Sequence, residues 1–157
     1  VSTFYGGFTV QEEVGLRGAQ MIAERIKPDV AIITDVCHDT QTPMINKIVQ
    51  GDLKMGDGPV LSYGPAVQNN LLNKVIDVAQ KNEIPFQRLA ASRATGTDTD
   101  AFAYSNEGVA SCLISLPLRY MHTTVETVHK SDVENVIRLI YEVLLSIEKN
   151  EDFRYLS

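Results

Sequence analysis

The stretch VAIITDV, at Val30–Val36, is a continuous run of mainly β-branched and apolar residues with Asp35 at its end. Strands of parallel sheets, which are covered on both faces, have this pattern. Pro28 and Asp29 precede the run and end a helical pattern over 16–27. The sequence therefore predicts a helix followed by a buried strand that carries a carboxylate at its carboxyl end.

Strand-like and helix-like patterns alternate along the rest of the chain. We expect strands at 2–10, 85–91 and 109–116, with Pro117 ending the last of them. We expect a helix at 66–81, a short helix within 92–105 that follows a polar loop, and a last helix that starts from an N-cap at Ser131. Residues 38–65 read as loops with short strands at 47–49 and 59–62. This alternation predicts an α/β fold, a three-layer sandwich around a mostly parallel mixed sheet.

Length and composition predict one domain over residues 1–157, because 157 residues with 44% apolar content can bury a core. The net charge of -6, with no cluster of Lys and Arg, argues against a nucleic-acid partner. No apolar run reaches about 18 residues, so we expect no membrane partner. Cys37 and Cys112 are too few for a disulfide framework, which favours reduced thiols and a cytoplasmic protein.

Four side chains lie at or just after the predicted ends of three strands: Glu12, Glu13, Asp35 and His122. Sites of α/β sheets lie beyond the carboxyl ends of the strands, so we expect these side chains to meet at one edge. Carboxylate and imidazole groups are ligands of Zn²⁺, Co²⁺ and Mn²⁺. The pattern indicates a hydrolytic metal site in which one carboxylate of the Glu12–Glu13 pair binds metal and the other handles protons.

The glutamate pair and the two remaining histidines also have simpler interpretations as surface residues. A pair of adjacent glutamates is common on solvated surfaces, and only the matching positions of Asp35 and His122 argue against that interpretation here. His38 and His129 are expected to be surface or loop histidines, although His38 follows Asp35 by three residues.

Two further segments have a structural and a functional interpretation. The loop Gly96, Thr97 and Asp98 either caps a helix or faces a substrate, with Asp98 supporting the metal ligands. Arg119 and Tyr120 either bind a substrate carboxylate or carbonyl, or form a structural pair with an acidic neighbour. The sequence contains neither a glycine-rich phosphate loop nor a G-x-S-x-G motif, which argues against a nucleotide cofactor and a serine nucleophile.

The quoted motifs also resemble a known family. FTVQEEVGLRGA at 8–19, ITDV at 33–36, GTDTDAF at 96–102 and ISLPLRYMHTTVE at 114–126 are similar to the deblocking or glutamyl aminopeptidase family of dinuclear metallo-aminopeptidases. The resemblance implies a zinc-peptidase-like fold, a peptide substrate and a homo-oligomer, since members of this family form tetrahedral dodecamers. Some relatives carry the name endoglucanase or cellulase.

The resemblance also implies a role for each site residue. Glu12 would be the general base, Glu13 and His122 would bind one metal, and Asp35 would bind the other. The complete site would hold two divalent metal ions, zinc or cobalt, with manganese as a further option. Arg119 and Tyr120 would lie beside the site, and Gly96, Thr97 and Asp98 would line the substrate pocket.

The family pattern requires two ligands that this sequence lacks, a histidine and a bridging aspartate, both before the QEE motif. The sequence opens on Val1 rather than Met, and we expect it to be the C-terminal portion of a longer catalytic domain. The N-terminal portion and a small inserted β domain would lie in the missing part. The chain alone would then bind metal weakly and could be inactive.

Three functions therefore stay open at this point. The first is removal of N-terminal residues from peptides by a metal-dependent reaction. The second is glycoside hydrolysis by two carboxylates without a metal, although a sequence without Trp makes a poor sugar cleft. The third is an inactive module that serves only in assembly or peptide binding.

Overall fold

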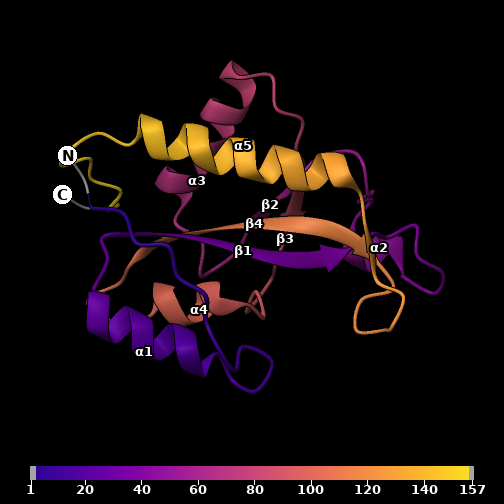
Figure 1. Ribbon diagram of the computed structural model, residues 1–157, viewed down its shortest axis with the longest axis horizontal. Helices are drawn as coiled ribbons and strands as arrows, with labels where there is room; N and C mark the ends of the chain where they lie inside the picture. Colours follow the sequence, from indigo (N-terminus) through magenta and orange to yellow (C-terminus); the bar gives the residue numbers. More distant parts are fainter. Residues whose placement is uncertain (1–2, 156–157) are drawn as a thin grey trace.

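A five-stranded sheet lies between two layers of helices in the computed structural model of the protein, which describes residues 3–155 (Figure 1). Helices α1 (Arg17–Ile26) and α4 (Asp98–Ala103) cover one face of the sheet. Helices α3 (Asn69–Lys81) and α5 (Lys130–Ser146) cover the other. The predicted three-layer α/β sandwich is confirmed.

The strands of the sheet are β1 (Val30–His38), β2 (Val60–Tyr63), β3 (Gln87–Ala90), β4 (Ala110–Arg119) and β5 (Thr127–Val128). Their order is β1-β4-β2-β3, and β5 pairs with β4. β1 and β4 are parallel along the whole of β1, and β2 and β3 are also parallel. The antiparallel pairings, β2 with β4 and β4 with β5, are short. The sheet is therefore mixed and mostly parallel, as predicted.

The main core lies between the sheet and the layer of α3 and α5. The stripe of helix α3 that the sequence predicts is buried there, together with the inner face of α5 and the strand residues facing them: Leu71, Leu72, Val75, Ile76, Ala79, Val136, Leu139, Val143, Cys112 and Ile114. A smaller cluster joins α1 and α4 to the opposite face through Ala19, Ala23, Ala31 and Phe102. Among residues 3–155, no helix has the length and apolar character needed to cross a membrane.

Two predicted strands are absent from the described residues. The predicted strand at 2–10 begins at Ser2, outside those residues, and Thr3–Val10 forms no strand because no neighbouring strand pairs with it. The predicted strand at 47–49 is instead the short helix α2 (Lys47–Gln50). The side chain of Asn46 caps this helix by accepting a hydrogen bond from the Ile48 amide at 3.0 Å.

The end of β4 and the start of α5 also differ from the prediction. β4 does not stop at Pro117 but continues to Arg119, because Pro117 lies where its partner on one side changes from β2 to β5. Helix α5 begins two residues early, since the His129 side chain, rather than Ser131, is the N-cap and accepts from the Ser131 amide. His129 is exposed, as predicted.

The first turn of α5 is held to the rest of the fold by a buried carboxylate. Asp132 is fully buried, and its two oxygens accept hydrogen bonds from the main-chain amides of Gly56, at 2.6 Å, and Gly58, at 2.9 Å. Gly58 has no room for a side chain, because an added Cβ would lie 2.3 Å from the Pro85 carbonyl oxygen. Asp132 therefore links α5 to the turn that leads into β2.

Replacement of Asp132 by Ala should lower the free energy of unfolding by about 2 to 3 kcal/mol, because two buried amides lose their acceptors. Urea unfolding followed by circular dichroism measures this change. Asp57 lies between the two glycines but is exposed, so Asp57→Ala is the matched control and should stay within about 0.5 kcal/mol of wild type. Equal effects of the two substitutions would contradict the role of Asp132.

Candidate active site

The carboxyl ends of β1 and β4 lie at the same edge of the sheet, because these strands are parallel neighbours (Figure 1). Asp35 belongs to the last part of β1, and His122 follows the end of β4 by three residues. Glu12 and Glu13 lie in the loop before α1, and all four side chains line one cavity of about 250 Å³. The convergence predicted from the sequence is therefore present in the structure.

The loop that carries the two glutamates is fastened to the start of α1. The Gly18 amide donates to the Val10 carbonyl at 2.9 Å, and the Leu16 amide donates to the Glu12 carbonyl at 3.0 Å. An added Cβ on Gly18 would lie 2.5 Å from the main chain of Val10, so only glycine permits this approach. Close main-chain packing, rather than strand pairing, brings Glu12 and Glu13 to the cavity.

Glu13 and His122, which are 109 residues apart in the sequence, are in direct contact. Glu13 Oε1 lies 3.0 Å from His122 Nε2, and both side chains are largely exposed. The main-chain amide of His122 donates to the Glu126 carboxylate, which holds the turn after β4. Carboxylate oxygens and imidazole nitrogens are both common zinc ligands, so this pair is a candidate part of a zinc site.

Negative charges raise the pKa of two carboxyl groups in the cavity. Burial raises the pKa of Glu12, and the charges of Asp35, Glu13 and Asp98 raise it further, against a smaller lowering by His122. Burial also raises the pKa of Asp35, although the Val36 amide, which donates to it at 2.7 Å, opposes the shift. A bound cation would relieve this repulsion.

The donor set fits divalent metal ions as a partial site. Asp35, Glu13 and His122 offer oxygen and nitrogen ligands at one cavity wall, and Oδ1 of the buried Asp98 lacks a hydrogen-bond partner within residues 3–155. In the same part of the chain, no three His, Cys, Asp or Glu side chains lie close enough together to hold one ion. The described residues thus offer candidate ligands for a metal ion but no complete ligand set for one.

The loop at 96–98 provides the helix cap that is the structural interpretation considered for it. Thr97 is the N-cap of α4, and its hydroxyl accepts from the Thr99 amide at 3.3 Å. Gly96 and Thr97 also line the cavity. Asp98 is buried behind this wall and does not belong to the residues that line the cavity in the described part of the chain.

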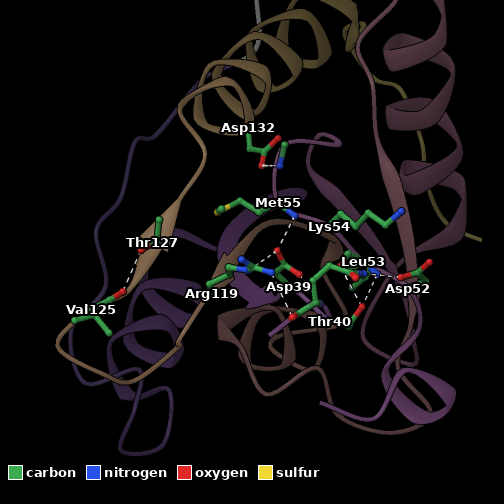
Figure 2. A network of polar contacts seen from close by, with 12 residues as sticks. Asp39, Thr40, Asp52, Leu53, Lys54, Met55, Arg119, Val125, Thr127 and Asp132 are labelled. Atoms are coloured by element: carbon green, nitrogen blue, oxygen red, sulfur yellow. Dashed lines mark hydrogen bonds and ion pairs between the residues drawn. The ribbon is translucent and has the colours of Figure 1, made fainter. Parts of the chain in front are cut away.

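Arg119 forms a structural pair with an acidic neighbour, which is one of the two interpretations that the sequence allows (Figure 2). Its Nε lies 3.2 Å from Oδ2 of the buried Asp39, and its Nη2 donates to the Gln41 carbonyl at 3.3 Å. Asp39 also accepts from the amides of Gln41 and Met55. This network fastens the loop after β1 to the end of β4. Neither Arg119 nor Tyr120 is among the described residues that line the cavity.

One residue predicted to lie on the surface is part of the cavity wall. His38 is half-buried and is the last residue of β1, because this strand continues two residues beyond the apolar stretch that predicted it. Val36, Cys37, Leu53 and Leu89 also line the cavity, and of these only Val36 belongs to a motif quoted from the sequence. Val36, Cys37 and Leu89 belong to the last parts of β1 and β3, so their place in the cavity follows from the topology of the sheet.

The two cysteines are unpaired, as predicted. Burial raises the pKa of Cys37 to about 12, with further contributions from Asp35, Asp132 and Asp39. Burial alone raises the pKa of Cys112 to about 12. Both groups therefore remain protonated thiols near neutral pH, which argues against a cysteine nucleophile in this cavity.

Comparison with known proteins identifies the family of this chain. Residues 2–139 match the family model described as M42 glutamyl aminopeptidase. The lysyl aminopeptidase of Pyrococcus furiosus is 41% identical over 145 residues, which cover 92% of this chain and 41% of that protein.

Two solved structures are also similar. The TET aminopeptidase from the marine sediment archaeon Thaumarchaeota archaeon SCGC AB-539-E09 is 36% identical with a TM-score of 0.80, over 89% of this chain and 39% of that one. The TET1 peptidase of Pyrococcus horikoshii is 34% identical with a TM-score of 0.69, over 87% of this chain and 39% of that one. That peptidase is described as able to assemble into a tetrahedron or a large octahedral shell. The chain spans about two fifths of the length of these relatives. With the family model matching most of its length, this chain belongs to the M42 glutamyl aminopeptidase family.

Proposed function

We propose that this chain is the C-terminal portion of the catalytic domain of a metal-dependent aminopeptidase, which removes N-terminal residues from peptides. The family supports this proposal, and so does the coverage of about two fifths of the relatives, which leaves room for an N-terminal portion and an inserted β domain. Residues 1–157 then form one part of a larger catalytic domain rather than a complete enzyme.

The contact between Glu13 and His122, in a cavity that Glu12 and Asp35 also line, is the observation that carries the proposal. Glu13 and His122 would hold one divalent metal, and Asp35 would hold the other. Zinc or cobalt suits this oxygen and nitrogen donor set, and manganese is a further option. When bound, two such metals polarise the scissile carbonyl and lower the pKa of water.

Glu12 is the residue that moves the proton. Its carboxylate accepts a proton from the attacking water and then donates it to the nitrogen of the leaving amine. Gly96 and Thr97, which also line the cavity, bind the peptide, whereas Arg119 and Tyr120 support the turn that carries His122.

The full-length protein is a homo-oligomer in this proposal, with the dodecamer of the family as the expected form. The assembly described for the TET1 peptidase of Pyrococcus horikoshii supports this expectation. The unpaired thiols of Cys37 and Cys112 support a cytoplasmic location. The net negative charge of the chain argues against nucleic acid or an anionic membrane as a partner.

A panel of substrates tests the proposal with the full-length protein. Aminoacyl anilides with a free α-amino group should be hydrolysed, and their N-acetylated counterparts should react at least about 100-fold more slowly, since the free amine is part of what the site recognises. Carboxymethyl cellulose is the control for glycoside hydrolysis. Cleavage of cellulose but not of the anilides would replace the proposal with the glycosidase interpretation, and cleavage of neither would favour a non-catalytic module.

A further inference from the structure

Asp98 is a buried carboxylate with only one of its oxygens in use. It is the first residue of α4 and is 8% exposed. Its Oδ2 accepts a hydrogen bond from the hydroxyl of Thr9, a residue 89 positions earlier in the chain. Its Oδ1 is buried and has no partner among residues 3–155. A buried carboxylate oxygen without a donor is costly to the fold, so stability alone does not account for Asp98.

Three other aspartates use both carboxylate oxygens as hydrogen-bond acceptors. Asp132 accepts from the amides of Gly56 and Gly58, and Asp39 accepts from those of Gln41 and Met55. Asp100, two residues after Asp98, accepts from the amides of Thr95 and Gly96 in the same way. In each case the carboxylate fastens a loop by its main chain, and both oxygens are satisfied. Asp98 differs because its partner is a side-chain hydroxyl rather than main-chain amides, and because its Oδ1 accepts no hydrogen bond from residues 3–155.

The partner of Asp98 lies on the segment that leads to the two glutamates. Thr9 is followed by Val10, whose main chain is packed against Gly18 of α1, and then by the turn that carries Glu12. The contact between Thr9 and Asp98 therefore attaches this segment to α4, while the contact of Val10 attaches it to α1. Asp98 is also close enough to Glu12 and Asp35 for its charge to raise the pKa of both groups.

We propose that Asp98 is a positioning residue for the reaction: by holding the hydroxyl of Thr9 it sets the place of Glu12 in the cavity, and it does not contact the substrate. The position of Asp98 behind the cavity wall agrees with this assignment. The inference rests on the proposed aminopeptidase function, because it concerns the proton transfer assigned to Glu12.

Loss of this contact should affect the reaction step more than substrate binding. A catalytic group displaced by about 1 Å can lose roughly 100-fold in rate. The residues that line the cavity from other elements, including Gly96 and Thr97, keep their own contacts when the Thr9 hydroxyl is removed. The expected signature is therefore a fall in kcat with little change in KM.

The test uses the full-length protein with the variants Thr9→Val, Asp98→Ala and the double variant. Each single variant should lower kcat on aminoacyl anilides by about 10- to 100-fold and leave KM within about threefold of wild type. The double variant should be no slower than the worse single variant, because both remove the same contact. Thr9→Ser keeps the hydroxyl and should recover most of the rate lost in Thr9→Val.

Hydrogen exchange provides a readout that does not depend on activity. The amides at 9–16 should exchange faster in Thr9→Val and Asp98→Ala, and those of α5 should not change. Asp132→Asn is the control for a buried aspartate on another element and should lower the midpoint of unfolding without faster exchange at 9–16.

Wild-type kcat in both single variants would overturn the inference, and so would losses that multiply in the double variant. A fall in bound metal equal to the fall in kcat would also overturn it, because Asp98 would then act on metal binding. An inactive wild-type protein would instead contradict the proposed function, and the exchange experiment would still test the contact between Asp98 and Thr9.

Discussion

Replacement of Glu12 by Gln in the full-length protein is expected to lower kcat by about 10²- to 10⁴-fold, the contribution typical of a general base. The amide has nearly the shape of the carboxylate but cannot accept the proton of the attacking water. Because Glu13, Asp35 and His122 are assigned to the metals and Glu12 is not, bound metal should stay at the wild-type level. KM should change little, since Glu12 acts in the reaction step.

Steady-state kinetics on an aminoacyl anilide, with metal content by mass spectrometry, measures both expectations. Glu107→Gln makes the same chemical change at an exposed position outside the cavity and is the matched control. Unchanged turnover in Glu12→Gln would remove this residue from its role. Loss of metal together with activity would instead place Glu12 among the ligands.

Removal of metal by EDTA should abolish the aminopeptidase activity, and Zn²⁺ or Co²⁺ should restore it. The like charges of Glu12, Glu13 and Asp35 face one cavity, and a cation there is the simplest source of electrophilic assistance to the scissile carbonyl. Activity that survives complete metal removal would rule out the proposed mechanism and would return attention to two carboxylates acting without a metal.

Removal of a single proposed ligand should weaken the binding of metal. His122→Ala should weaken metal binding at least about 100-fold, because the imidazole is proposed as a direct ligand and even supporting residues of metal sites contribute 10- to 100-fold. His129→Asn is the matched control, since it changes an exposed histidine and keeps a side chain able to cap α5. Titration with Zn²⁺ in a competition assay gives the affinities, and equal affinities in the two variants would contradict the assignment of His122.

Much of the fold is predictable from local patterns. The apolar stretch Val30–Val36 is β1, and the predicted helices at 16–27 and 66–81 are α1 and α3 with shifted ends. The two helices each bury one face, as their patterns predict, whereas β1 is mostly half-buried and contacts a core cluster on each side of the sheet through alternate residues. The segment 47–49 was misassigned because a short polar cap, the side chain of Asn46, decided its conformation.

The missing strand at Thr3–Val10 has a different cause. β-branched and aromatic residues favour a strand, but a strand forms only when a neighbour supplies hydrogen bonds, and no strand of the described chain does so. The extension of β4 through Pro117 likewise depends on which strands flank it. Neither outcome is encoded within the segment itself.

The sequence by itself determined most of the order of helices and strands, the candidate site residues Glu12, Glu13, Asp35 and His122, and the family to which their motifs belong. The tertiary structure decided which of these side chains meet. The contact of Glu13 with His122, the ion pair of Arg119 with Asp39 and the contact of Thr9 with Asp98 each join residues far apart in the chain. Such contacts arise from the parallel register of β1 and β4 and from the close packing at Gly18, and local sequence patterns carry no information about distances of this kind.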